Sequence, residues 1–94
     1  MTNYKYSLYE QHNINPAGNG RAEWITTREI IKDSDRTERN IELSLSKDTM
    51  AHFRSMHSKQ QVRRSKKNGK EIVKIFSYFP NDNNNRTVHE YREV

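Results

Sequence analysis

The segment Ile72–Phe79 constrains the fold of this chain more than any other. It reads Ile-Val-Lys-Ile-Phe-Ser-Tyr-Phe, with large apolar side chains at both odd and even positions. Because successive side chains of a strand point to opposite faces of a sheet, this pattern predicts a central strand that is buried on both faces. Hydrophobic residues make up 31% of the chain, well below the roughly 45–50% of an average globular chain. We therefore expect the core to form around this strand, with Trp24, Leu43 and Phe53 packed against it.

A hairpin is predicted at the start of the chain. Apolar and more polar residues alternate over 4–9, which indicates a half-buried strand. Residues 13–20 read Asn-Ile-Asn-Pro-Ala-Gly-Asn-Gly, a composition typical of a loop. The segment 23–31 then returns as the partner strand. The alternative for this second strand is a helix that begins at Thr26, with Glu29 three residues later as in a capping box.

Another strand is predicted over residues 41–45, after a polar segment (32–39) suited to a turn. Here Ile41, Leu43 and Leu45 alternate with polar residues, which is the clearest period of two in the chain. Eleven residues are Ile or Val and three are Leu, a ratio that also favours strands.

One principal helix is predicted over residues 47–61. Ser46 stands at the N-cap position and Asp48 in the first turn, where a carboxylate meets the positive end of the helix dipole. The apolar residues within this segment recur at helical spacing, at Met50, Phe53 and then Met56 or His57. The apolar stripe is narrow, which indicates a helix lying on one face of a sheet.

The segment 62–67 has two interpretations. It either extends the helix, with Asn68-Gly69 as a left-handed C-cap, or forms a strand that Asn68-Gly69 joins to strand 70–79 by a tight turn. Pro80 ends that later strand, and the five residues 81–85 are expected to form a flexible connection.

These elements predict an α+β fold: an antiparallel sheet of about four to five strands with one principal helix on one face. Residues 86–94 would add an edge strand or a frayed tail. The length predicts a single small domain spanning residues 1–94.

Composition narrows the compartment and the kinds of ligand. The chain has no Cys, no apolar run of the ~20 residues that a membrane span needs, and no signal-peptide pattern at its start. We expect a cytoplasmic protein with no membrane partner. No glycine-rich phosphate loop or other cofactor motif is present, so no cofactor and no small-molecule substrate are predicted.

Positive charge is concentrated in residues 54–74. This segment sums to +7, whereas the remaining residues sum to −2. Such a patch attracts phosphate backbones, and Phe76 and Tyr78 nearby are candidates for stacking on unpaired bases if one face of their strand is open. The leading hypothesis is a non-enzymatic module that binds nucleic acid, or a nucleic-acid-handling complex. Its predicted binding residues are the eight cations of this segment: Arg54, Lys59, Arg63, Arg64, Lys66, Lys67, Lys70 and Lys74.

Two other interpretations of this patch stay open. A basic segment can be a solvated face that keeps a polar protein soluble. An acidic protein surface is also a possible partner. In size and composition the chain is similar to small proteins of phages and mobile elements, among them anti-CRISPR inhibitors, so the second hypothesis is an inhibitor that docks on a host protein complex.

Catalytic and metal-binding patterns are weak. His52 and His57 are five residues apart on the predicted helix, which does not place them on one face, so no metal site is expected. A cluster of His, Tyr and Arg at the C-terminus gives a third hypothesis, a small metal-independent ribonuclease. On a strand, however, His89 and Tyr91 would share one face while Arg86 and Arg92 occupy the other. We therefore predict that the protein is not an enzyme.

Overall fold

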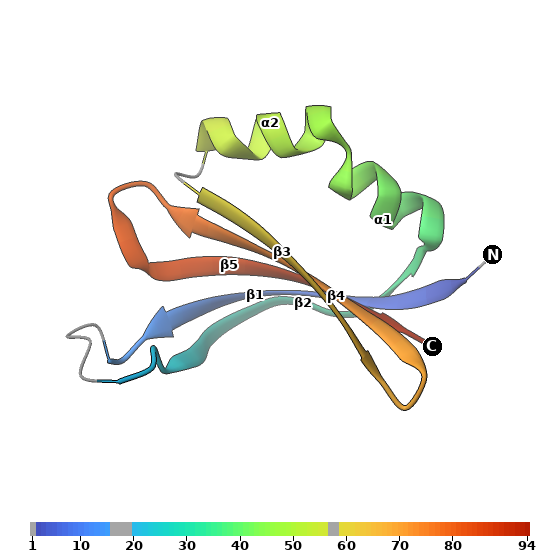
Figure 1. Cartoon of the computed structure of the whole chain (residues 1–94), viewed down its shortest axis with the longest axis horizontal. Helices are drawn as coiled ribbons and strands as arrows, with labels where there is room; N and C mark the ends of the chain where they lie inside the picture. Colours follow the sequence, from blue (N-terminus) through green and yellow to red (C-terminus); the bar gives the residue numbers. More distant parts are fainter. Residues whose placement is uncertain (1, 16–19, 57–58) are drawn as a thin grey trace.

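The computed structural model describes residues 2–15, 20–56 and 59–94, with the backbone alone described for 53–56. A five-stranded antiparallel sheet has the order β2-β1-β5-β4-β3, and two short helices lie over one of its faces (Figure 1). This arrangement confirms the predicted α+β class. The elements in chain order are β1 (Asn3–Asn13), β2 (Trp24–Thr37), α1 (Glu38–Leu45), α2 (Lys47–Met56), β3 (Lys59–Lys67), β4 (Lys70–Phe79) and β5 (Asp82–Glu93).

The hairpin at the start of the chain is confirmed, and it is longer than predicted. β2 pairs with β1 over its whole length, from Asn13 opposite Trp24 to Asn3 opposite Thr37. The helix proposed as the alternative from Thr26 is therefore wrong. The polar segment 32–39 does not turn: residues 32–37 continue β2, residues 38 and 39 begin α1, and Asp33 takes a left-handed φ of 57°. Of the loop 13–20, residues 16–19 lie outside the described residues.

Residues 41–45 form a helix, which corrects the strand predicted there. Ile41 and Leu45 are one helical turn apart, so both reach the sheet, and Leu43 between them is 54% exposed. A five-residue segment with apolar residues at positions 1, 3 and 5 fits a short helix as well as a strand. In a helix, positions 1 and 5 lie on one face. Leu43 is consequently not part of the core.

The predicted helix over 47–61 begins where expected and ends early. Ser46 Oγ accepts a hydrogen bond from the Thr49 amide at 3.3 Å, which confirms the N-cap. α2 ends at Met56 and β3 has begun by Lys59, so the last residues predicted as helix belong to a strand. The side chain of Phe53 and the whole of His57 lie outside the described residues.

The segment 62–67 is a strand, as in the second of its two interpretations. Asn68 and Gly69 adopt left-handed φ values of 54° and 77°, the backbone of a two-residue hairpin turn between β3 and β4. β4 lies in the interior of the sheet, as predicted, although the middle position belongs to its neighbour.

β5 is that middle strand, so the edge strand or tail predicted for 86–94 is wrong. It also begins at Asp82, within the segment expected to be a flexible connection. Val88 is 0% and Tyr91 4% exposed, because β1 and β4 flank the strand on both sides. Most residues of β5 are polar, so the sequence does not indicate a strand in the middle of the sheet. Several of these polar residues bond to side chains of β1, as Arg86 does to Gln11.

The core lies between the sheet and the helices. Its buried residues come from four elements, and Ile75 of β4 is 1% exposed among them. Trp24 belongs to the opposite face of the sheet, where it contacts Tyr78, so its predicted place in this core is wrong. The cluster consists of Tyr4, Tyr6, Ile41, Val73, Ile75 and Tyr91, with Leu8, Leu45 and Met50 packed against it.

Candidate nucleic-acid interface

The sheet has one face covered by helices and one face that no described helix covers (Figure 1). Val73 and Ile75 belong to the covered face because they pack with Ile41 of α1. Residues directly opposite one another on paired strands share a face, so the ladder assigns the remaining side chains. The face away from the helices is called the open face below.

Five of the eight predicted cations lie together on the open face. Lys59, Arg63 and Lys67 of β3 lie opposite Tyr78, Lys74 and Lys70 of β4, respectively. We call these five cations the basic ribbon: Lys59, Arg63, Lys67, Lys70 and Lys74. Arg64 and Lys66 point to the helix side of the same hairpin, since Arg64 lies opposite the core residue Val73. The side chain of Arg54 lies outside the described residues.

Two pairs in the basic ribbon place like charges directly opposite each other, Arg63 with Lys74 and Lys67 with Lys70. Such cross-strand pairs destabilise a sheet, whereas opposite charges stabilise it. Within the described part of the chain, no acidic side chain comes within 4 Å of these four cations. On the helix side, by contrast, Arg64 pairs with Glu71 at 3.3 Å. Lys74 has Glu90 of β5 as its other cross-strand neighbour, but this carboxylate bonds to Tyr9 and Arg92. The open face of the hairpin therefore carries an excess of positive charge.

The turn end of the β3–β4 hairpin extends away from the helices (Figure 1). Every residue from 62 to 70 is exposed, on both faces of the ribbon. Arg63, Lys67 and Lys70 thus lie in high dielectric, which reduces their mutual repulsion and leaves them accessible to a large anionic partner, while Lys74 is half-buried.

The basic ribbon ends at a cluster of aromatic side chains around Arg86, formed by Trp24, Phe76 and Tyr78 (the aromatic cluster). The Arg86 guanidinium carbon lies 3.8 Å from the centre of the Trp24 ring and 4.2 Å from that of Phe76. The rings of Trp24 and Tyr78 meet edge to face, with their centres 5.9 Å apart. Lys59, the first cation of the ribbon, lies 5.6 Å from the Tyr78 ring centre.

The rest of the open face, over β1, β2 and the end of β5, is electrically compensated. Arg92 pairs with Asp33 at 2.6 Å and with Glu90 at 3.5 Å. Tyr9 donates a hydrogen bond of 2.8 Å to Glu90. Burial, together with that carboxylate, raises the pKa of Tyr9 well above its ordinary value of 10.0. The charge of Arg92 is therefore offset on this part of the face, whereas no cation of the basic ribbon has an ion pair among the described residues.

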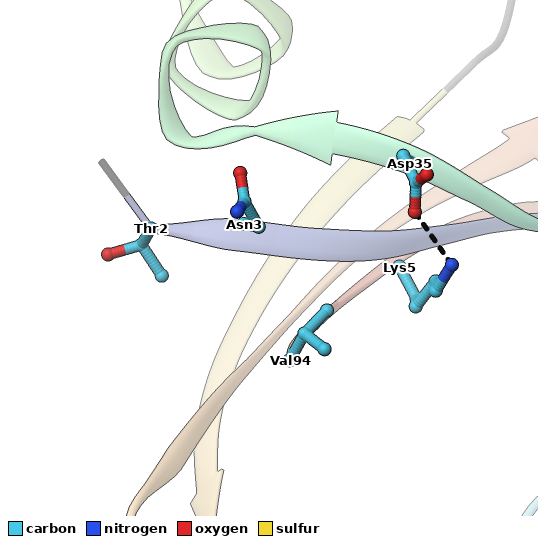
Figure 2. Close-up of a pocket in the computed structure, with 5 residues that line it drawn as sticks. All are labelled: Thr2, Asn3, Lys5, Asp35 and Val94. Carbon is cyan, nitrogen blue, oxygen red and sulfur yellow. Dashed lines mark hydrogen bonds and ion pairs between the residues drawn. The ribbon is translucent and has the colours of Figure 1, made fainter.

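A hollow of about 570 Å³ lies at the compensated end of the sheet, near both termini. Figure 2 shows Lys5 and Asp35 joined across it, with 2.6 Å between Nζ and Oδ1. The ion pair raises the pKa of Lys5 and lowers that of Asp35, chiefly through their hydrogen bond. With Thr2, Asn3 and Val94 as its other lining residues, this hollow offers no nucleophile–base pair and no unpaired cation.

The C-terminal cluster considered for ribonuclease chemistry is divided between the two faces, as predicted. On the helix side, His89 Nδ1 lies 2.8 Å from the Tyr6 hydroxyl, and the Tyr91 hydroxyl lies 2.8 Å from Ser44 Oγ. Arg86 and Arg92 are on the open face, in the contacts described above. A cavity of about 250 Å³ lies next to this His–Tyr network, and the side chain of Arg36 is among its lining residues.

Among the described residues, no group of three or more His, Asp or Glu side chains is arranged to hold a metal ion. Neither helix has the length and apolar character needed to cross a bilayer, again within the described part of the chain.

Sequence reasoning did not find Trp24 or Arg86 as part of this surface. The sequence pattern favours Trp24 for the core and Arg86 for a ribonuclease cluster. Their contact is not visible in the sequence, because it depends on β1 lying between their two strands. The one sequence signal for this contact is an Arg in a strand of a chain that also contains aromatic residues. That signal does not identify which rings the Arg contacts unless the strand register is known.

Comparisons with models of protein families, with curated proteins and with solved structures find no match for this chain.

Proposed function

We propose that this protein is a non-enzymatic module that binds nucleic acid through the basic ribbon. The observation that carries the proposal is the pair of like-charge contacts, Arg63 with Lys74 and Lys67 with Lys70, on a face that no described helix covers. A phosphate backbone between such cations would remove their repulsion and gain attraction from both strands at once.

Protection of the sheet edge explains part of this charge. β3 is an edge strand, and lysines on edge strands prevent unwanted pairing with other chains. Lys74, however, stands on β4 where that strand is paired on both sides, with Arg63 of β3 and Glu90 of β5, whereas Lys70 lies beyond the last position paired with β5. Edge protection needs no cation at an interior position, so Lys74 favours a partner over a merely solvated face.

The length of the basic ribbon suits a polymer. Lys59 and Lys67 are eight residues apart on one strand, which corresponds to roughly 26 Å at about 3.3 Å per residue. A polyanion crossing this distance meets cations from both strands. An isolated phosphate would meet one or two of them.

Neutralising the ribbon tests the proposal against a matched control. The double variant Arg63→Gln/Lys67→Gln removes two ribbon cations, and Arg28→Gln/Lys32→Gln removes two exposed cations of β2, at the other edge of the sheet. Both variants have the same net charge. Titration against labelled DNA and RNA should show the ribbon variant weakened about tenfold or more, as expected for the loss of two phosphate contacts, and the control close to the parent.

Equal weakening of the two variants would mean that overall charge, and not the ribbon, governs binding. Absence of parental binding even at low salt would overturn the proposal, and docking on an acidic surface of a host protein complex would take its place. We also propose that the protein works in the cytoplasm, because a chain without Cys has no disulfide that needs an oxidising compartment.

A further inference from the structure

The geometry points to single-stranded nucleic acid as the ligand, with unpaired bases stacked on Trp24 and Tyr78 at one end of the basic ribbon. We infer this from the aromatic cluster, and it rests on the proposed function. Phosphates and base faces, the two groups recognised, are common to DNA and RNA.

The aromatic cluster is held rigidly. The guanidinium of Arg86 lies between the rings of Trp24 and Phe76. Arg86 Nε donates a hydrogen bond of 2.8 Å to Gln11, and its NH1 group donates one of 3.2 Å to the Tyr78 hydroxyl. These contacts fix the two outer rings before any ligand arrives, so little side-chain entropy remains to be lost on binding.

The cluster retains accessible aromatic surface. Phe76 is 8% exposed and serves as the support beneath Arg86, so it cannot stack on a base itself. Trp24 and Tyr78 are half-buried. Although the burial of a Trp in a hydrophobic core would stabilise a small domain, this Trp lies on the open face, on an edge strand. A base stacked on it would cover surface that the fold leaves exposed.

The charge of Arg86 is not neutralised by the described residues. Its contacts are the amide oxygen of Gln11, a phenol and ring faces, and no carboxylate lies within ion-pair distance. The cluster is therefore electropositive as well as aromatic, the combination found where bases stack beside bound phosphates.

The cationic path and the aromatic cluster meet at Lys59. This residue lies directly opposite Tyr78, with its Nζ 5.6 Å from the ring centre. A strand whose phosphates follow the ribbon would bring a base onto Tyr78 at that point. A duplex keeps its bases stacked inside the helix, so it can use the cations but not the rings.

A duplex has its own way of using the hairpin, because the major groove of B-DNA admits a two-stranded β-ribbon. In that arrangement the aromatic cluster at the opposite end of the ribbon would contribute nothing. The preference between single strand and duplex therefore separates the two modes of binding.

Trp24 is the one Trp of the chain, so its fluorescence reports directly on the aromatic cluster. The parent is titrated with DNA and RNA single strands of about 12 nucleotides, within the usual range of such sites, and with a duplex of the same length. We expect both single strands to quench Trp24 and to bind more tightly than the duplex. The duplex should leave Trp24 unchanged.

The variant Tyr78→Ala tests the stacking itself. It should weaken single-strand binding about 5- to 150-fold, the fold-change of about 1–3 kcal/mol per stacked base. The slope of affinity against salt should stay the same, since no phosphate contact is lost. Tyr78→Phe keeps the ring, loses only the hydroxyl bond to Arg86, and should bind like the parent. A variant that simply unfolded would lose the salt-dependent binding altogether, which thermal unfolding identifies.

Equal affinity for duplex and single strand, with unchanged Trp24 fluorescence, would overturn this inference and leave the proposed function intact. So would a folded Tyr78→Ala variant that binds single strands like the parent. Failure of every nucleic acid to bind at low salt would instead overturn the proposed function, and this inference with it.

Discussion

Arg63 of β3 and Lys74 of β4 lie directly opposite each other on the open face of the sheet. Cross-strand neighbours of like charge cost a sheet stability. Glu90 of β5 is the other cross-strand neighbour of Lys74, but it bonds to Tyr9 and Arg92, and no carboxylate of the described residues lies within ion-pair distance of either cation. The chain thus keeps an arrangement that lowers the stability of its own fold. Retention of such a cost at a surface is expected where the residues serve a ligand.

Replacing one member of this pair should raise stability while it lowers binding. In Arg63→Glu the new carboxylate faces Lys74, so the free energy of unfolding should increase by about 0.2–1 kcal/mol. Arg64→Glu is the matched control, because it breaks the ion pair with Glu71 and places two carboxylates together, which should decrease stability. Urea denaturation measures both. If Arg63→Glu is destabilised as much as Arg64→Glu, the repulsion described here is absent.

The core prediction concerns Ile75, which is 1% exposed beneath the helices. Ile75→Ala should lower the free energy of unfolding by about 2–5 kcal/mol through lost burial and the cavity that remains. Val62 lies opposite Ile75 on β3 but is exposed, so Val62→Ala should change stability by no more than about 0.5 kcal/mol. Thermal unfolding of the two variants would contradict this view of the core if their midpoints fell together.

Alkaline pH should destabilise the protein partly through Tyr6. Burial raises the pKa of this phenol from 10.0 to about 12. The neutral form is therefore favoured in the folded state. The stability it contributes is complete below pH 10 and is lost as the pH rises towards 12, at up to about 1.4 kcal/mol per pH unit. Urea denaturation between these pH values measures the slope. Tyr6→Phe should show a shallower decline than the parent, and an identical slope would show that Tyr6 is not involved.

The His–Tyr network on the helix side should matter for folding and not for ligand binding. His89→Ala removes the partner of the Tyr6 hydroxyl and Tyr91→Phe that of Ser44, at about 1–3 kcal/mol of stability each. Their affinity for nucleic acid should match that of the parent in a titration below the unfolding transition. Cleavage of RNA by the purified parent, abolished in His89→Ala, would contradict our prediction that the protein is not an enzyme.

The strength of local signals explains which elements the sequence could predict. The β3–β4 hairpin follows from two local patterns, each of which predicts the backbone of its own segment. Asn68-Gly69 predicts a tight turn, and the apolar run Ile72–Phe79 predicts a strand buried on both faces. β5 could not be predicted as the middle strand, because Val88 and Tyr91 are its two buried residues and most of the others are polar, several of them bonded to β1 as Arg86 is to Gln11. The apolar positions of Ile41–Leu45 fit both the period of two of a strand and the spacing of four of a helix. The choice between strand and helix depends on how α1 packs on the sheet.

The candidate site divides in the same way. Its charge is visible in the sequence, since the cations are concentrated in one segment, but the face on which each cation lies depends on residues 62–67 being a strand. The contact of Arg86 with Trp24 joins residues far apart in the chain, and it requires β1 to lie between their strands. Periodicity cannot supply that register, so the aromatic end of the site became visible only in three dimensions.

The salt dependence of binding to a labelled single strand tests the central claim most directly. If all five cations of the basic ribbon contact phosphates, the logarithm of the affinity should fall with the logarithm of the salt concentration at a slope of about −3.5. Between about 50 and 200 mM salt the affinity should then fall roughly a hundredfold, and Lys74→Gln should make the slope shallower by about 0.7. A parent that shows no binding at the lower salt concentration, or a slope that Lys74→Gln leaves unchanged, would contradict the account.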